Sequence, residues 1–321
     1  MQQEIRIVRY NDSLINEWNA IISNSKNGTF LLNRNFMDYH KERFNDCSLM
    51  FVNEKDKFIA CLPANYDTES RTVYSHQGLT YGGFILLKDV TALNVETILN
   101  LTIDYYRQLG AQRLIYKPIP SIYSSYPSEE DLYFLFRHNA HLVARGLSQT
   151  IIPKENLTLN KGRKYCRNKA IHAGLQVTES PSDIEGFWNV LNDTLQKHHN
   201  VSPVHSVSEL QLLISRFPEQ IHLYVVKDAE QNILAGSLVF DTGKVVHTQY
   251  MAASEQGKQI GALDLLITTL VSDVYYDKSF FDFGISTEDG GKILNEGLLY
   301  QKESFGGRSI CYDSWELNIE M

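Results

Sequence analysis

The chain has 321 residues, of which 43% are hydrophobic, and its 30 basic and 38 acidic residues give a net charge of −8. This length and apolar content suffice for one large domain or two ordinary ones, and they exclude a mainly disordered chain. The acidic balance argues against DNA as a partner, but a local basic patch is compatible with it. The N-terminus has no apolar leader and no apolar stretch reaches about 18 residues, so we expect a cytoplasmic protein without a membrane span.

The first half of the chain mixes helical and strand patterns. Its expected elements are, in order, helices at 12–22 and 35–44, strands at 48–52, 58–63 and 72–74, a glycine-bearing loop at 75–83, a long helix at 90–109 and a strand at 113–116. Gly110 directly follows the long helix, as is usual for a residue that ends a helix in the left-handed conformation.

The second half repeats this order of elements. Its expected elements are helices at 160–172, 182–199 and 207–216, strands at 223–226, 233–240 and 245–251, a long amphipathic helix at 259–275 and a strand at 280–283. A strand set, a long helix and a short strand thus occur twice, without sequence identity between the copies. We predict an α/β (α+β) protein of two tandem domains, 1–150 and 151–321, each with a mixed central sheet flanked by helices.

Several common catalytic signatures are incomplete or absent. The sequence has no G-x-G-x-x-G for a dinucleotide and no H-E-x-x-H for a metal. Gly290-Gly291-Lys292 looks like the end of a phosphate loop, but Ser286 and Ile293 stand where that loop needs other residues. Gly284-Ile285-Ser286 begins like the turn that carries a nucleophilic serine, but the closing glycine is missing. We therefore expect neither a metal site nor serine hydrolysis.

Four short segments of the C-terminal half form a series. They are Ala235-Gly236, Tyr250-Met251-Ala252-Ala253-Ser254, Phe281-Asp282-Phe283-Gly284 and Gly297-Leu298-Leu299-Tyr300-Gln301-Lys302-Glu303-Ser304-Phe305-Gly306. Together with the basic segment Lys161–Ala170 they resemble the tandem acetyltransferase-like (GNAT-fold) proteins of the Fem type, which are aminoacyltransferases that build peptidoglycan cross-bridges. The resemblance implies two GNAT-like domains, of which the second carries these motifs.

By this resemblance, Lys302 occupies the place of a lysine that stabilises the oxyanion formed during aminoacyl transfer. Gln301 precedes it, where the family often has phenylalanine. The role is also sound on physical grounds, because acyl transfer passes through an anionic tetrahedral species that a fixed ammonium stabilises when water is excluded. The alternative is a surface lysine that pairs with Glu303 or Glu296.

Three further residues of this region are candidates for the reaction. Asp282 is a candidate to position an amine or accept its proton, or else to cap the turn at Gly284. Gln249 and Tyr250 stand at a strand end, where GNAT folds open to receive an acyl chain, so we expect Gln249 to bind substrate. Tyr250 is a candidate to donate a proton to the leaving group, or else a packing residue.

The segment 156–178 contains no acidic residue, which is unusual in a chain of net charge −8. Arg163 and Arg167 lie four residues apart, so a helix places them on one face, where they can grip a phosphate together. Lys161 and Lys164 flank that face. A pyrophosphate-bearing precursor or a tRNA backbone would suit this helix. The alternative is a solvated helix face without a ligand.

Acetyl-CoA users of the GNAT fold hold the pyrophosphate on a glycine-rich loop at a helix N-terminus. The corresponding segment here, 255–263, is degenerate, because Leu263 stands where a small residue is needed. The expected co-substrate is an acyl donor, aminoacyl-tRNA or acyl-CoA, with ordinary acetyl-CoA disfavoured and no cofactor tightly bound. In the first domain, Tyr81 and Gly82 are expected to contribute backbone to the wall of a substrate groove.

We predict an acyl- or aminoacyltransferase that acts on an amine of a phosphorylated or cell-envelope-related acceptor. The acceptor is a small molecule or a cell-wall precursor, and tRNA is a candidate donor. Two alternatives stay open: a non-catalytic ligand-binding protein that kept the fold, and an acetyl-CoA-dependent N-acetyltransferase acting on a small amine. The sequence leaves the donor, the acceptor and the oligomeric state undefined.

Overall fold

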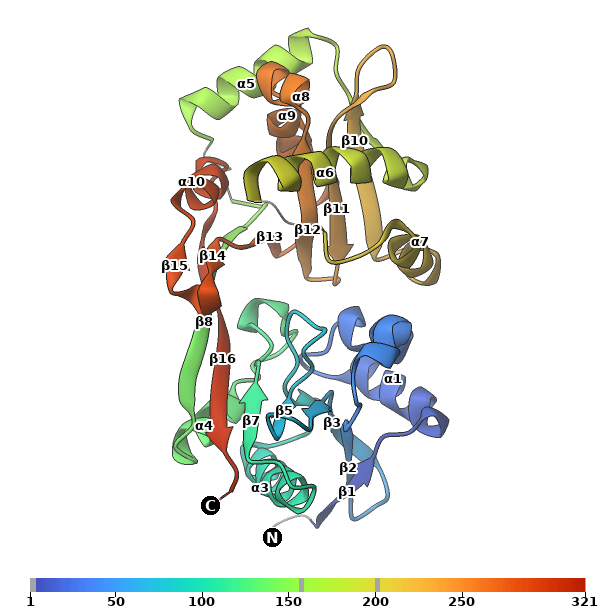
Figure 1. Ribbon diagram of the computed structural model, residues 1–321, viewed down its shortest axis with the longest axis vertical. Helices are drawn as coiled ribbons and strands as arrows, with labels where there is room; N and C mark the ends of the chain where they lie inside the picture. The colour runs from blue at the N-terminus through green and yellow to red at the C-terminus, as the bar shows by residue number, and fades with distance from the viewer. Residues whose placement is uncertain (1–3, 156–158, 200–202, 321) are drawn as a thin grey trace. The chain divides into compact units, whose positions relative to one another are not determined.

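The computed structural model describes residues 4–155, 159–199 and 203–320 (Figure 1). The chain divides into two compact units: unit 1 comprises Met1–Gly146, Asp289–Lys292 and Cys311–Met321, and unit 2 comprises Leu147–Glu288 and Ile293–Ile310. The C-terminal segment thus belongs to unit 1, whereas the sequence placed it in the second domain. The reason is that β16 (Arg308–Asn318) pairs antiparallel with β7 (Arg113–Tyr116).

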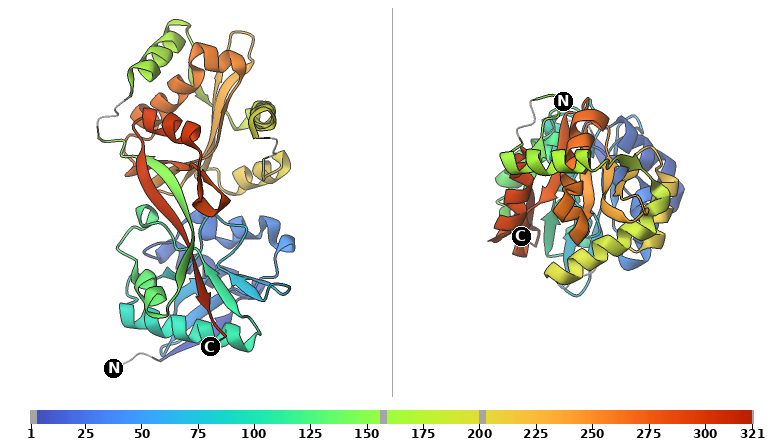
Figure 2. Two further views of the ribbon diagram at one scale, coloured as in Figure 1. Left: turned by 60° about the vertical axis from the view of Figure 1, so that its left-hand side comes forward. Right: turned by 90° about the horizontal axis from the view of Figure 1, so that it is seen from above.

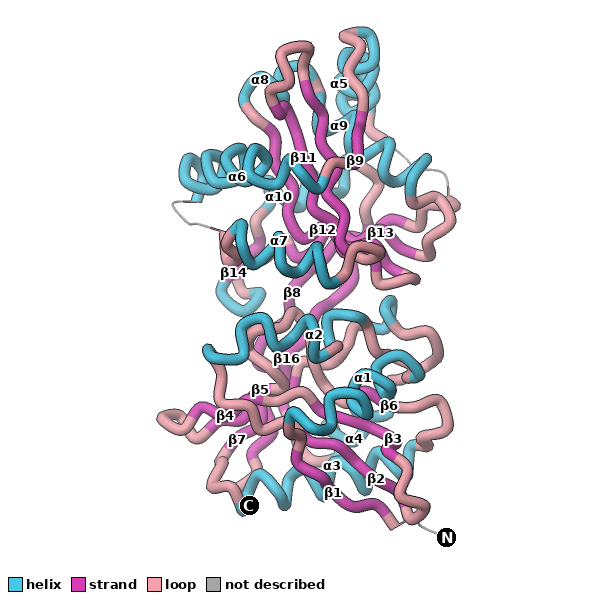
Figure 3. The backbone as a smooth tube through the Cα atoms, turned by 90° about the vertical axis from the view of Figure 1, so that its right-hand side faces the viewer, coloured by secondary structure: helices cyan, strands magenta, loops and turns pink. Residues whose placement is uncertain are grey.

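Unit 1 contains an antiparallel sheet in the order β1-β2-β3-β6 and a second strand set in the order β4-β5-β7-β16. Its other strands are β1 (Ile5–Arg9), β2 (Leu49–Asn53), β3 (Phe58–Leu62), β4 (Asn65–Asp67), β5 (Thr72–Tyr74) and β6 (Ile85–Leu86). Its helices are α1 (Ile15–Asn24), α2 (Arg34–Met37), α3 (Ala92–Gln108) and α4 (Glu130–Arg137) (Figure 3). Phe51, Leu99 and Tyr116 are fully buried in its core.

The strands of unit 2 follow the order β8-β13-β12-β11-β10-β9. They are β8 (His141–Ile151), β9 (Val177–Glu179), β10 (Ile221–Lys227), β11 (Ile233–Asp241), β12 (Val245–Ala253) and β13 (Phe280–Ile285). Strand β8 begins in unit 1. A separate small hairpin pairs β14 (Thr287–Glu288) with β15 (Ile293–Leu294). The helices are α5 (Lys161–His172), α6 (Ile184–His199), α7 (Val207–Arg216), α8 (Glu255–Ile260), α9 (Ala262–Thr269) and α10 (Glu296–Ser304). Helix α6 lies on one face of this sheet and α9 on the other (Figure 1, Figure 2). Within the described ranges, no helix has the length and apolar content that crossing a bilayer requires.

The sheet of unit 2 opens between β12 and β13. These strands pair in parallel where Val245–His247 faces Phe280–Asp282, and β12 then continues to Ala253. On its other edge, β12 pairs with β11 through a β-bulge in which Gln249 is the extra residue. A bulge bends and twists its strand, and here it lies just beyond the last pair that β12 forms with β13.

The long helix expected at 259–275 forms as two helices. Gly261, with φ of +82°, separates α8 from α9, and a π-helical turn over Leu270–Val274 follows α9. A Cβ on Gly261 would lie 2.2 Å from the carbonyl oxygen of Cys166 in α5. The glycine therefore permits both the left-handed backbone and the close approach of α5.

Gly261→Ala should lower the free energy of unfolding more than Gly243→Ala does. Both glycines have a positive φ, but a methyl group at 243 meets nothing within 4 Å, whereas at 261 it meets the backbone of Cys166. We expect a loss of about 1–2 kcal/mol at Gly243 from the backbone conformation, and roughly 1–3 kcal/mol more at Gly261 from the clash. Urea denaturation followed by circular dichroism measures both losses. Equal losses would contradict the contact assigned to Gly261.

Candidate functional site

The carboxylate of Asp282 is the centre of a buried polar cluster in unit 2. Asp282 lies on β13 with none of its surface exposed. Its Oδ2 accepts a hydrogen bond from Nδ1 of His247 on β12 at 2.7 Å, and its Oδ1 accepts one from Oγ of Ser148 on β8 at 2.5 Å. The register of β12 and β13 places His247 directly beside Asp282. Side chains from three strands thus meet at one carboxylate, and we call Asp282, His247, Ser148 and the adjoining Lys302 the Asp282 cluster.

Lys302 is buried on α10. Only 3% of the residue is exposed, and its Nζ donates to the carbonyl oxygens of Gly284 at 2.8 Å and Ile285 at 2.7 Å. Burial lowers the pKa of Lys302 to about 8, and the negative charge of Asp282 opposes this shift. The alternative of a surface lysine paired with a neighbouring glutamate is therefore wrong.

Gly284 connects His247 to Lys302. Its φ of +75° departs from strand geometry, and a Cβ there would lie 3.2 Å from Cε1 of His247. Its carbonyl oxygen is one of the two that accept from Lys302. The imidazole of His247 therefore packs over the backbone that Lys302 holds in place.

Sequence reasoning missed His247 and Ser148, because neither belongs to a motif of fixed spacing. Their contacts with Asp282 join residues that are far apart in the chain and meet only when three strands pair. The one available signal was a histidine directly after Val245 and Val246, two apolar residues of the strand expected at 245–251. A polar residue in such a position needs a partner inside the protein.

Tyr250 belongs to an aromatic group formed by β12, α6 and the segment before α7. Its hydroxyl lies 2.7 Å from Nδ1 of His205, and its ring meets Trp188 edge to face at a centroid distance of 5.1 Å. Burial raises the pKa of Tyr250. Gln249, the bulge residue, precedes it on β12. The roles of Tyr250 in proton transfer and of Gln249 in substrate binding stay predictions.

Arg163, expected to grip a phosphate together with Arg167, is tied to the interior of unit 2. Its NH1 donates to Oδ1 of Asp264 at 3.0 Å, and its Nε donates to Oγ of Ser304 at 2.8 Å. Its guanidinium also lies over the ring of Phe305, 4.4 Å from the centroid. Burial raises the pKa of Asp264, although the charge of Arg163 opposes the shift. The joint grip needs correction, since the Arg163 charge already has a carboxylate partner.

The outer part of α5 carries other cations. Lys161 and Lys164 are exposed. Arg167 donates from Nε and NH2 to the side-chain oxygen of Asn168, at 3.1 and 2.9 Å, so this partner is neutral. We call Lys161, Lys164 and Arg167 the basic face of α5, and the prediction of anion binding now rests on it.

Tyr81 and Gly82, expected in the wall of a substrate groove, lie inside unit 1. Tyr81 is 3% exposed, and its hydroxyl lies 2.9 Å from Oγ1 of Thr29. The amide of Gly82 donates to the carbonyl oxygen of Lys117 at 2.9 Å, and a Cβ on Gly82 would lie 2.0 Å from the carbonyl oxygen of Ser75. Both residues are enclosed by the core, so their assignment to substrate binding needs correction.

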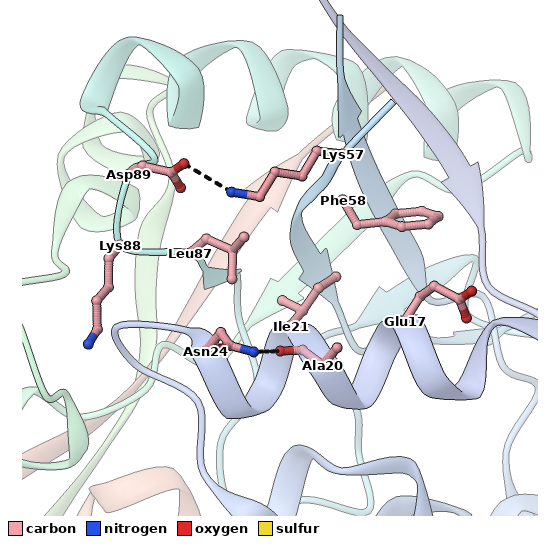
Figure 4. A pocket seen from close by; sticks show the side chains of 9 residues that line it. All are labelled: Glu17, Ala20, Ile21, Asn24, Lys57, Phe58, Leu87, Lys88 and Asp89. Carbon is pink, nitrogen blue, oxygen red and sulfur yellow. Dashed lines mark hydrogen bonds and ion pairs between the residues drawn. The ribbon is translucent and has the colours of Figure 1, made fainter. Parts of the chain in front are cut away.

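A cavity of about 520 Å³ in unit 1 is lined by none of the predicted site residues (Figure 4). Its apolar lining includes Ile21, Phe58 and Leu87, and its polar lining includes the ion pair of Lys57 and Asp89 at 3.2 Å. No part of the described chain brings together three His, Cys, Asp or Glu side chains able to hold a metal ion. We take the Asp282 cluster as the best candidate for chemistry because it combines a buried carboxylate, an imidazole and a buried ammonium.

Arg163→Met should destabilise the fold by about 3–5 kcal/mol, because it leaves the buried carboxylate of Asp264 without its partner. The double variant Arg163→Met/Asp264→Leu should recover most of this loss, and Arg167→Met should cost little. Urea denaturation measures all three. In Arg163→Met, stability should also rise as the pH falls, because the folded state favours the protonated carboxyl of Asp264. Equal stability of Arg163→Met and Arg167→Met would contradict the ion pair.

Comparison with known proteins gives the fold an independent test. Residues 158–289 match a family model described as an acetyltransferase (GNAT) domain, and no curated protein sequence matches the chain. The crystal structure of FemX aligns with a TM-score of 0.69 at 11% identity, with 98% of each chain covered. A tandem GNAT protein from the clavulanic acid biosynthesis pathway aligns with a TM-score of 0.53 at 11% identity, with 98% of this chain and 99% of that chain covered.

A third similar structure is the C-terminal domain of a proposed lysylphosphatidylglycerol synthetase from Agrobacterium fabrum. It aligns with a TM-score of 0.60 at 12% identity, with 96% of this chain and 93% of that chain covered. Identities this low show the fold alone. The segment that matches the family model contains His247 and Asp282, whereas Ser148 and Lys302 lie outside it. The predicted fold is confirmed: the chain has a tandem GNAT fold and resembles the Fem-type proteins, and its residues 158–289 match the GNAT domain model.

Proposed function

We propose that the chain is an acyltransferase that moves an acyl or aminoacyl group to an amine of a phosphorylated or cell-envelope-related acceptor. The observation that carries this proposal is the buried ammonium of Lys302, held near Asp282 where β12 and β13 separate. The GNAT match supports acyl transfer as the reaction class. The names of FemX and of the lysylphosphatidylglycerol synthetase support aminoacyl groups and cell-envelope acceptors.

The ammonium of Lys302 suits the charge that develops during acyl transfer. An ammonium has three N–H donors, and the carbonyl oxygens of Gly284 and Ile285 accept from it. A further N–H would donate to the oxyanion of the tetrahedral intermediate. Because Lys302 is fixed and shielded from water before the reaction, such a contact is worth roughly 3 kcal/mol of transition-state stabilisation.

Coenzyme A, the acyl carrier that the GNAT fold implies, does not fit where that fold usually holds its pyrophosphate. The corresponding segment forms α8 and the first turn of α9, where Asp264 places a buried carboxylate. Helix α5 covers the same turn, through the carbonyl of Cys166 and the guanidinium of Arg163. The carboxylate of Asp264 already occupies the N-terminus of α9, where the helix dipole favours a negative charge, and it would repel a pyrophosphate placed there. This supports a donor other than a CoA ester bound in the usual manner, such as aminoacyl-tRNA.

The basic face of α5 supports a substrate that carries phosphate groups. Its two exposed lysines and the half-buried Arg167 belong to a helix within a segment that contains no acidic residue, 156–178. Tyr165, on the same helix, is 71% exposed and offers an aromatic ring beside these charges. Cations with an adjoining ring favour a phosphate backbone or a nucleotide. A pyrophosphate-bearing acceptor and a tRNA donor both meet this description.

Lys302→Met should reduce the transfer rate by about 10²–10³-fold, because the intermediate loses its charge partner. The assay follows a labelled amino acid from aminoacyl-tRNA to the amine of a peptidoglycan precursor. In the unmodified protein, the rate should fall as the pH rises through about 8, where the ammonium of Lys302 loses its proton. Lys278→Met is the control, since Lys278 also donates to a carbonyl and an aspartate in unit 2.

If the Lys302→Met protein has an unaltered thermal transition and an unchanged transfer rate, Lys302 has no catalytic role. Lys302→Gln, which keeps a hydrogen-bond donor without the charge, is the second variant if Lys302→Met does not fold. It should also transfer slowly, because the oxyanion requires a cation in this position.

Replacing Lys161, Lys164 and Arg167 together by glutamine should weaken the binding of one phosphate-bearing substrate by about tenfold or more. Each lost phosphate contact should also lower the slope of log affinity against log salt concentration by about 1. Fluorescence anisotropy with unacylated tRNA and with a UDP-linked precursor distinguishes donor from acceptor. Lys258→Gln is the control, since Lys258 is paired with Glu255 on α8. Unchanged affinity for both ligands would show that the basic face of α5 is a solvated helix surface that binds neither of them.

A further inference from the structure

We propose that His247 accepts the proton of the attacking amine and that Asp282 positions it for this task. The inference rests on the proposed acyl transfer and adds the residue that activates the acceptor. Asp282, expected from the sequence as a catalytic residue in its own right, then acts through His247.

The contact between the two side chains selects the state of the imidazole. Nδ1 of His247 donates to Oδ2 of Asp282 at 2.7 Å. In the neutral ring, this places the proton on Nδ1 and the lone pair on Nε2, which is the tautomer a proton acceptor needs. A carboxylate in this position also stabilises the imidazolium that forms when Nε2 takes a proton.

Asp282 and His247 differ in how far their side chains are buried. The side chain of Asp282 has no exposed surface, whereas 14% of the His247 side chain is exposed. Part of the His247 side chain is therefore open to a substrate, whereas the carboxylate of Asp282 is not. A buried carboxylate costs several kcal/mol unless it is fully paired, and an uncharged amide could bridge the strands at lower cost. A charge kept here at that cost points to chemistry rather than packing.

The position of the pair in the sheet gives it access to a substrate. His247 and Asp282 form the last parallel pair between β12 and β13, and the bulge residue Gln249 follows two positions later. Beyond this pair β12 continues without β13 as its parallel neighbour in the register. A side chain at position 284 would crowd the imidazole, because a Cβ there would lie 3.2 Å from Cε1 of His247. Glycine at this position leaves the ring in place.

The groups near His247 come from the neighbouring strands and from α10. Asp282 faces it from β13, Phe240 is its partner on β11, and Ser148 on β8 shares the carboxylate of Asp282. The Lys302 ammonium on α10 donates to the carbonyl of Gly284, the residue against which the ring packs. Asp282 and Lys302 thus bring opposite charges to the cluster: the anion orients the ring, and the cation would donate to the acyl oxygen.

The transfer step is balanced with these residues. The amine nitrogen forms a bond to the acyl carbon of the ester donor, the electron pair of the carbonyl double bond moves to its oxygen near Lys302, and the amine proton passes to Nε2 of His247. When the intermediate collapses, the bond from the acyl carbon to the ester oxygen breaks. That oxygen leaves with the proton from His247, which gives an amide, a free hydroxyl on the donor and a neutral imidazole.

His247→Gln should lower kcat for transfer from aminoacyl-tRNA by about 10²–10⁴-fold, with KM and the thermal midpoint little changed. A proton acceptor works only in its unprotonated form, so the rate of the unmodified protein should also fall at acid pH, and this fall should be absent in His247→Gln. His222→Gln is the matched control, because Nδ1 of His222 also lies 2.7 Å from a carboxylate oxygen, that of Glu179, on another strand of unit 2. This control should keep the full rate and the acid limb of the profile.

Chemical rescue separates proton transfer from packing. Imidazole added to the His247→Ala variant should raise its transfer rate by about tenfold or more. A purely structural role of His247 would not produce this effect. If neither His247 variant folds, diethyl pyrocarbonate is applied to the unmodified protein and the modified histidines are mapped by mass spectrometry. Loss of transfer should then follow the modification of His247.

Two failures can be told apart. A folded His247→Gln protein with the rate and pH profile of the unmodified protein, or full transfer after modification of His247, overturns the role of His247 and leaves acyl transfer standing. An unmodified protein that transfers no acyl group from aminoacyl-tRNA or from acetyl-CoA overturns the proposed function and the role of His247 with it.

Discussion

One buried negative charge organises the candidate site. The carboxylate of Asp282 has no exposed surface, and His247 and Ser148 both donate to it. The same charge favours the protonated form of Lys302, which burial disfavours. Because these partners come from β12, β8 and α10, the carboxylate joins four elements at the point where the sheet begins to open. The carboxylate adds an orienting contact for the imidazole and a favourable charge for the ammonium, whose own hydrogen bonds are to the carbonyls of Gly284 and Ile285.

A second buried ion pair, Arg163 with Asp264, ties α5 to the start of α9, the part of the domain where CoA users of the GNAT fold hold the pyrophosphate. The carboxylate lies in the first turn of α9, and the guanidinium comes from α5. The pair brings α5 over the helix N-terminus that a pyrophosphate would need, with Gly261 allowing the close approach. The same contact commits Arg163 to the interior, so only the outer cations of α5 remain for a phosphate-bearing substrate.

Local signals predicted the long helices and the central strands, but they missed the two longest strands, β8 and β16, and long-range contacts decided the site. Gly110 marked the end of the long helix of unit 1, which forms as Ala92–Gln108 because its ends carry their own stop signals. Gly261 was read as part of a helix, since its left-handed backbone depends on packing against α5. Arg163 was given to a ligand because its partner lies 101 residues away in the chain. The pairing of His247 with a carboxylate followed from strand register, which no residue pattern encodes.

The identity of the acyl donor tests the proposed function most directly. The GNAT match by itself favours acetyl-CoA, whereas the covered turn of α9 and the basic face of α5 favour aminoacyl-tRNA. The direct measurement is mass spectrometry of a peptidoglycan-precursor amine after incubation with the protein and each donor in turn. An amide product formed from aminoacyl-tRNA and none from acetyl-CoA is the predicted result, and a product formed from acetyl-CoA alone would contradict it.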